Sequence, residues 1–416
     1  KSKTRYHEIR NYPENTDVIV NYTYESKYPS KRGGSSVTDS RFISVLVQHS
    51  LIRMPTNNYK PRYDDTRVGY FTTQTNDMTT IDRVNYRDFI NRWSLVKKDL
   101  SEDLSEPEEP IVWWIENTTP YELRDIIKDG VEAWNIAFEK AGFRNAIQVK
   151  IQSDTANWGA GDIRYNVLRW TSSPSPPWGG YGPSFVNPRT GQILGADIML
   201  EWSYITRRIF EDNLFNNSED NLEHHYCTAA EHQQIETSFG IDYIKIFDLG
   251  SEMEKELIKQ SLYRLVLHEV GHTLGLNHNF KGSTLLTTDE LNNKEIVDKK
   301  GVCNSVMEYP AINITRRSED QGLFFDVKPG LYDIWAIEFG YSQYARVKKD
   351  FLVNKEFIPE DVNFGIKIDR VQRFIQSSEP AQNLEKLELE DLYELRLPSV
   401  VMILNILPKE KEEIIE

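Results

Sequence analysis

Apolar and polar residues alternate along the first quarter of the chain, a pattern that predicts β-strands. One stretch places apolar or aromatic side chains at every second position: Val18, Val20, Tyr22 and Tyr24. Residues 42–52 form a second strand candidate, and a turn-rich segment at 61–71 leads into another. We therefore predict a β-rich N-terminal region over residues 1–105, which ends at an acidic, proline-containing linker over 100–110.

Beyond this linker the apolar spacing becomes helical. The run Thr119-Pro120-Tyr121-Glu122 predicts a capping box with proline at the first helical position. The helix predicted over 120–141 has one apolar face: Leu123, Ile127, Val131, Trp134 and Phe138. Gly142 is expected to end it. Strands are predicted around this helix at 113–115, 147–151, 162–170 and 196–202.

A second capping pattern, at residues 251–254, opens a helix that ends in a histidine-rich stretch. Residues 268–278 are His-Glu-Val-Gly-His-Thr-Leu-Gly-Leu-Asn-His. Residues four apart on a helix differ by about 40° around its axis, so His268 and His272 point the same way. The two imidazoles can therefore share one metal ion.

The end of this stretch supplies a third ligand. Gly275 fits a helix stop because glycine tolerates positive φ, and the chain then reverses to bring His278 to the metal. Three neutral imidazoles leave the fourth tetrahedral position of one Zn²⁺ ion open for water, which is the catalytic arrangement. Glu269 would take the proton of the zinc-bound water and pass it to the leaving amine. Three of the eight histidines lie in this stretch, which argues against a chance match.

The stretch resembles the HExxHxxGxxH signature of the metzincin clan of zinc peptidases. About thirty residues downstream, Ser-Val-Met-Glu-Tyr at 305–309 is similar to the Met-turn of astacins and serralysins. The resemblance implies that Met307 places its polarisable thioether below the imidazoles. It also implies that Tyr309 donates a hydrogen bond to the oxyanion formed during the reaction. A packed tyrosine with a satisfied hydroxyl group is the alternative for Tyr309.

The resemblance also implies a fold. We expect an α+β, metzincin-like domain over residues 106–345, with a mixed, mostly parallel twisted sheet, a long backing helix, an active-site helix and a Met-turn subdomain. A mostly helical extension is predicted at 346–416. The strand at 196–202 is either the edge strand above the cleft, where an extended substrate would pair with it, or an ordinary core strand.

Residues 332–341, which include a predicted helix at 332–339, strengthen the similarity to a group of large bacterial Met-zincin proteins. Those proteins are mostly secreted or periplasmic and carry a β-rich region before the peptidase domain. The resemblance therefore implies a secreted, periplasmic or cell-surface location. The chain opens on Lys1 without a signal-like segment, so we expect a processed or a trimmed form. Asn279, just after the third histidine, differs from the residue that marks each well-studied metzincin family.

Composition limits the partners. A net charge of −15 argues against nucleic acid, and no apolar run is long enough to span a membrane. Cys227 and Cys303 either pair or stay free, because spacing alone does not decide. The histidines of the polar middle region are expected at the surface rather than in a second site: His224, His225 and His232.

These observations predict a zinc metalloendopeptidase that acts on peptide or protein substrates. The alternatives are a zinc hydrolase that acts on a non-protein acyl or cell-wall substrate, and a zinc-binding scaffold without turnover. An intact Glu269 argues against the scaffold, because a protein that has lost its catalytic activity need not retain the general base.

Overall fold

The computed structural model describes residues 3–28, 39–76, 78–79, 81, 88–172, 180–201 and 229–343. The extension predicted at 346–416 lies outside these residues. The chain divides into two compact units, the larger holding residues 1–64 and 69–353. Residues 65–68 belong to the smaller unit, where they form a turn closed by the Val68 N–H and the Asp65 carbonyl (2.8 Å).

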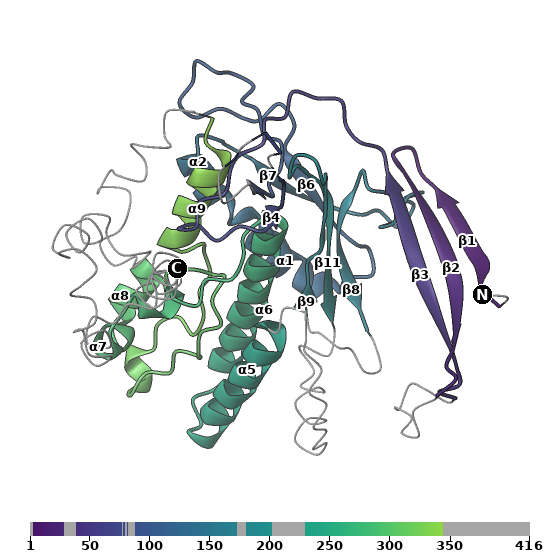
Figure 1. Ribbon diagram of the computed structural model, residues 1–416. Helices are drawn as coiled ribbons and strands as arrows, with labels where there is room; N and C mark the ends of the chain where they lie inside the picture. The colour runs from purple at the N-terminus through teal and green to yellow at the C-terminus, as the bar shows by residue number, and fades with distance from the viewer. Residues whose placement is uncertain are drawn as a thin grey trace, which may run out of the picture. The chain divides into compact units, whose positions relative to one another are not determined.

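An antiparallel three-stranded sheet forms the start of the chain (Figure 1). Its strands are β1 (Arg5–Asn11), β2 (Asn15–Glu25) and β3 (Phe42–Ile52), in the order β1-β2-β3. The strands predicted from the alternation at 18–24 and at 42–52 are thus confirmed. Two short strands follow, β4 (Thr72–Thr73) and β5 (Phe89–Ile90), which pair antiparallel.

The second, six-stranded sheet is mostly parallel, as predicted. Its strands are β6 (Ile111–Ile115), β7 (Ile147–Ile151), β8 (Asn166–Thr171), β9 (Gly180–Tyr181), β10 (Ser184–Val186) and β11 (Ile193–Glu201). Strands β11, β8, β6 and β7 run parallel, whereas β9 and β10 pair antiparallel with β11. Because β11 is paired on both sides, the edge-strand interpretation of 196–202 is wrong. The short strands β9 and β10 take that edge.

The helix predicted over 120–141 is two helices, α1 (Tyr121–Glu132) and α2 (Asn135–Lys140). The break falls at Trp134, whose fully buried indole N–H donates to the carbonyl of Leu267 (3.1 Å). The predicted capping box is also wrong, because Pro120 is the N-cap and no side chain caps the helix. Gly142 has φ +90° and follows the end of α2, where a C-terminal glycine is expected.

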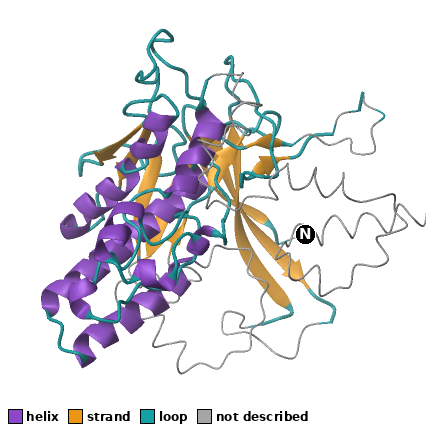
Figure 2. Cartoon of the chain, turned by 90° about the vertical axis from the view of Figure 1, so that its left-hand side faces the viewer, coloured by secondary structure: helices purple, strands orange, loops and turns teal. Residues whose placement is uncertain are grey.

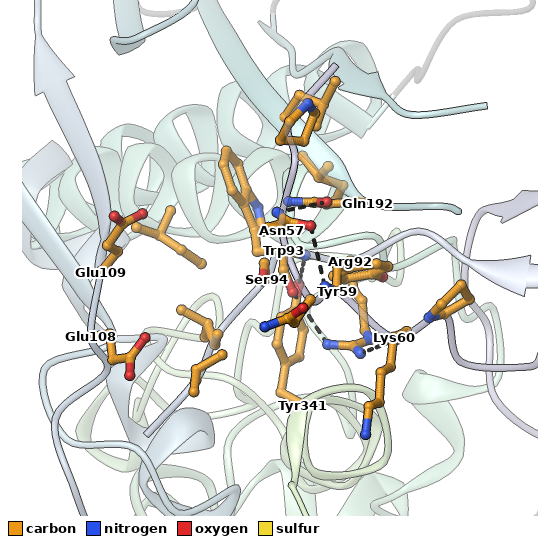
Figure 3. A pocket seen from close by; sticks show the side chains of 18 of the residues that line it. Asn57, Tyr59, Lys60, Arg92, Trp93, Ser94, Glu108, Glu109, Gln192 and Tyr341 are labelled. Atoms are coloured by element: carbon orange, nitrogen blue, oxygen red, sulfur yellow. Dashed lines mark hydrogen bonds between the residues drawn. The ribbon is translucent and has the colours of Figure 1, made fainter. Parts of the chain in front are cut away.

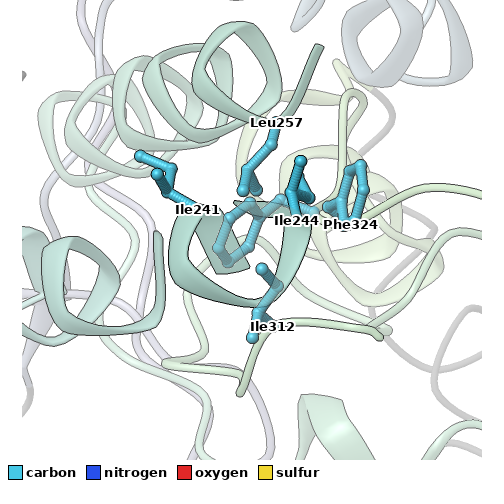
Figure 4. Close-up of a cluster of buried hydrophobic side chains, with 6 residues drawn as sticks. Ile241, Ile244, Leu257, Ile312 and Phe324 are labelled. Carbon is cyan, nitrogen blue, oxygen red and sulfur yellow. The ribbon is translucent and has the colours of Figure 1, made fainter. Parts of the chain in front are cut away.

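Two long helices pack side by side next to this sheet: α5 (Ala229–Ile246) and α6 (Ser251–Thr273) (Figures 1 and 2). Helix α6 starts where predicted, although Gly250 is its N-cap and no side-chain cap forms. It also packs against α1, β9 and β11. A cluster of buried apolar side chains joins α5 and α6 to the segment that follows the histidine stretch (Figure 4): Ile241, Ile244, Leu257, Ile312, Phe324 and Phe325.

After the histidine stretch, the described chain consists of short elements and one longer helix. The elements are η1 (Gly282–Thr284), α7 (Thr288–Leu291), α8 (Lys294–Lys300), η2 (Ser318–Asp320) and α9 (Leu331–Tyr341). Helix α9 confirms the helix predicted at 332–339, and it packs on α2. Among the described residues, no helix combines the length and apolarity needed to cross a bilayer.

A buried carboxyl group in the sheet predicts a pH dependence of stability. Asp197 on β11 accepts the backbone N–H of Val167 on β8 (3.1 Å), and burial raises its pKa from 3.8 to about 7. The folded chain therefore holds this proton more tightly than the unfolded chain. The resulting stability is fully present below about pH 4 and is lost as the pH rises through about 7.

The wild type should lose free energy of unfolding when the pH rises from about 5 to about 8. We expect this loss to be smaller by roughly 2 kcal/mol in Asp197→Asn, which keeps the oxygen acceptor. Urea unfolding at both pH values measures this loss. Asp289→Asn, at an exposed position on α7, is the matched control and should leave the loss unchanged. Equal losses in wild type and Asp197→Asn would contradict the prediction.

Candidate metal centre

The end of α6 and the turn after it bring the three predicted ligands together. His268 and His272 are buried on the last turns of α6, and His278 is half-buried beyond the turn. One nitrogen from each ring lies within 4.8 Å of the others, and the Nε2 atoms of His272 and His278 are 3.1 Å apart. The three side chains therefore form a compact group that could hold one ion.

The outer nitrogens of two of these rings are engaged by backbone carbonyls. His268 Nδ1 lies 2.7 Å from the carbonyl of Val306, and His272 Nδ1 lies 2.9 Å from that of Leu276. A carbonyl only accepts hydrogen bonds, so each Nδ1 carries the proton and each Nε2 keeps its lone pair. Burial lowers the pKa of His272 to about 3 and that of His268 well below its usual range. Neutral imidazoles with oriented lone pairs fit a divalent metal ion.

Glycine is required at 275 for two reasons. Its φ is +96°, a conformation that other residues rarely adopt. A Cβ atom there would also lie 1.9 Å from the carbonyl oxygen of Asn91. The sequence indicates the first reason, whereas the second depends on a segment almost two hundred positions away.

Glu269 is fully buried between α6 and the edge of the sheet. Neither carboxylate oxygen accepts a well-aligned hydrogen bond from the described residues, although the Gly182 backbone is close enough to lower the carboxyl pKa slightly. Burial outweighs that contact and raises the pKa to about 8. Gly180 on β9 lies directly over the carboxylate, since a Cβ there would be 3.0 Å from Glu269 Oε1. A buried carboxylate with so few partners, next to three imidazoles, fits a site that holds an ion and water.

Met307 is fully buried against the helix turn between the first two histidines. A Cβ atom at Gly271 would lie 2.3 Å from the Met307 sulfur, so only glycine leaves room for the thioether. Sequence reasoning missed this role of Gly271. A glycine inside a helix costs about 1 kcal/mol relative to alanine, which is a signal that could have indicated a close contact.

Comparison with known protein families gives two matches. Residues 250–357 match the family described as Met-zincin, and residues 1–98 match a domain of unknown function (DUF5117). Residues 250–357 belong to a metzincin-clan family. No curated protein and no solved structure matches the chain. The Met-zincin family implies zinc, and the three histidines could bind it.

A buried arginine fixes the segment around Met307, which follows the histidine stretch. Arg264, one helical turn before His268, donates hydrogen bonds to the carbonyls of Val306 (2.5 Å) and Glu308 (2.8 Å). The Val306 carbonyl thus accepts hydrogen bonds from both Arg264 and His268. Asp326, also buried, lies 4.0 Å from the guanidinium group. The sequence gives no sign of this role, because most arginines on helices are exposed.

Tyr309 lies against the third histidine. Its hydroxyl oxygen is 3.0 Å from His278 Nε2, and its ring packs on Phe280 (5.2 Å between centroids). The ring of His232 on α5, a half-buried residue, also stacks on Tyr309 (6.1 Å between centroids). Sequence spacing could not show this contact, because α5 was not predicted.

Other residues singled out from the sequence are less informative. His224 and His225 lie outside the described residues, as does Cys227. Cys303 is buried with a free thiol.

A cavity of about 1460 Å³ lies elsewhere in the larger unit (Figure 3). Neither Glu269 nor any of the three histidines lines it. Its wall mixes basic side chains with acidic ones: Lys60, Arg62, Arg92, Glu108, Glu109 and Glu338. This mixture favours no particular charge of ligand. Trp93 and Tyr341 line the cavity and also contact the end of α6.

Proposed function

We propose that the protein is a zinc-dependent endopeptidase. The observation that carries this proposal is the buried carboxylate of Glu269 beside three imidazoles, each with one nitrogen within 4.8 Å of the others. The match of residues 250–357 to the Met-zincin family supports it. We further propose residues 106–345 as the peptidase domain, 1–105 as an N-terminal region, and a secreted or periplasmic location in a bacterium.

His268, His272 and His278 would hold one zinc ion. When bound, the ion lowers the pKa of a coordinated water to about 7 and polarises the carbonyl of the substrate. Glu269 accepts the proton of the attacking water and then delivers it to the amine that leaves. Burial favours this role, because a carboxylate without strong donors binds a proton more tightly than an exposed one.

Tyr309 would stabilise the charge that develops on the substrate oxygen. Its hydroxyl group already lies 3.0 Å from His278 Nε2, so a modest side-chain movement would direct it at a nearby oxyanion. Met307, packed against Gly271, would support the turn that carries His268 and His272.

The edge of the sheet favours an extended peptide as substrate. Strands β9 and β10 form the edge beside α6, and Gly180 and Gly182 lie over Glu269. A peptide that paired its main chain with this edge would pass next to the carboxylate. Main-chain pairing suits a protein substrate better than a small acyl compound.

Removal and return of the metal test the proposal. We expect dialysis against a chelator to abolish cleavage of a denatured protein, and one equivalent of Zn²⁺ per chain to restore it. Metal analysis and gel densitometry give the two measurements. A chain that binds no zinc would overturn the proposal. Inertness toward denatured proteins combined with hydrolysis of a small acyl ester would instead support a non-protein substrate.

A further inference from the structure

The C-terminal end of α6 exposes backbone carbonyls that the helix itself cannot satisfy. The indole N–H of Trp93 donates to the carbonyl of Thr273 (2.8 Å). The hydroxyl group of Tyr341 donates to the carbonyl of Leu274 (2.9 Å) and accepts the backbone N–H of Trp93 (3.2 Å). Two side chains distant in sequence thus cap the helix that carries His268 and His272.

The turn between His272 and His278 is held by backbone hydrogen bonds to residues 69–71, which, like Trp93, lie in the N-terminal part of the chain. The N–H of Phe71 donates to the carbonyl of Gly275 (2.7 Å), and the N–H of Asn277 donates to the carbonyl of Gly69 (3.0 Å). Tyr70 and Leu276 form an antiparallel bridge between these two bonds. Residues 69–71 and 275–277 therefore form a short two-stranded ladder.

This ladder bears directly on two of the three metal-site histidines. The Leu276 carbonyl inside it is the acceptor for His272 Nδ1 (2.9 Å). His278 follows the ladder at once, so the path of the turn sets its position. The ring of Phe71 also packs against the imidazole of His272, with 5.5 Å between centroids.

We propose that residues 69–71 and Trp93 are positioning residues of the metal centre. They lie within the segment that matches the domain of unknown function, and they place His272 and His278 relative to His268. This inference rests on the proposed zinc site and adds a role for the N-terminal segment. The geometry of the site would thus depend on two segments of different families.

A pair of tryptophan variants tests the inference. Trp93→Phe keeps an aromatic ring and removes the donor to Thr273. Trp113→Phe on β6 is the matched control, because this fully buried indole has no hydrogen-bond partner among the described residues. Competition with a chromogenic chelator measures zinc affinity, and the visible absorption spectrum of the Co²⁺-substituted protein measures the ligand geometry.

We expect Trp93→Phe to weaken zinc binding by about tenfold to a hundredfold and to change the Co²⁺ spectrum, as losses around metal ligands commonly do. Trp113→Phe should retain the affinity and spectrum of the wild type. Equal zinc affinity and identical spectra for the two variants would overturn the inference and leave the proposed function standing. A wild type that binds no zinc would instead overturn the proposed function.

Phe71→Leu provides a second comparison in case Trp93→Phe does not fold. It keeps the backbone N–H and an apolar side chain, and removes the ring from His272. We expect an altered Co²⁺ spectrum in a cooperatively folded protein. A spectrum identical to that of the wild type would argue against a positioning role for this segment.

Discussion

We expect Glu269→Gln to lower kcat/KM for peptide hydrolysis by about 10²–10⁴-fold and to leave zinc binding intact. The glutamine amide has nearly the same shape but cannot take a proton from water. Glu269 is fully buried and is not part of the histidine group, so its replacement removes proton transfer without removing a ligand. Cleavage of a quenched fluorescent peptide and metal analysis together measure both effects.

Glu252→Gln is the matched control for this substitution. It lies on the same helix, but its side chain is exposed and pairs with Lys255. Its activity and zinc content should equal those of the wild type. If Glu269→Gln hydrolysed the peptide as fast as the wild type, Glu269 would not be the base and the proposed mechanism would fail.

We expect Arg264→Met to lower the free energy of unfolding by about 3–5 kcal/mol. The guanidinium group is buried, so its loss leaves the carbonyls of Val306 and Glu308 without these donors. It also leaves the buried carboxyl group of Asp326 without its nearest cation. Removing one member of a buried charged network costs far more than removing an exposed ion pair.

Urea unfolding of the metal-free protein measures this loss separately from zinc binding. Arg317→Met, which breaks an exposed ion pair with Asp320, is the matched control and should cause no measurable change. A decrease of less than about 1 kcal/mol for Arg264→Met would contradict the view that this arginine fixes the segment around Met307.

Part of the fold could be predicted from local periodicity. The strand at 42–52 and the starts of α6 and α9 follow from spacing that one element shows by itself. Helix α5 was missed because its sequence is polar at many positions, and its stability comes from packing on α6. The edge strand was placed at 196–202 because β9 and β10, two and three residues long, give no periodic signal.

The same limit applies to the candidate site. The three histidines and Glu269 lie within eleven consecutive residues, so helical geometry and the turn predicted at Gly275 could group them. Arg264 and Trp93 act on backbone carbonyls 42 and 180 positions away. Such contacts depend on how the chain folds back on itself, which residue spacing does not encode. The two predicted capping boxes are absent, because Pro120 and Gly250 are the N-caps of α1 and α6 and neither helix has a side-chain cap.

The contacts that hold α6 come from residues synthesised both before and after the histidines. Trp93 precedes its acceptor by 180 positions, whereas the Val306 carbonyl that Arg264 and His268 share is made after both. A nascent chain whose histidines have just left the ribosome still lacks the Val306 carbonyl that accepts hydrogen bonds from Arg264 and His268. The contacts that hold His268 and Arg264 would therefore form only after residue 306 has been synthesised.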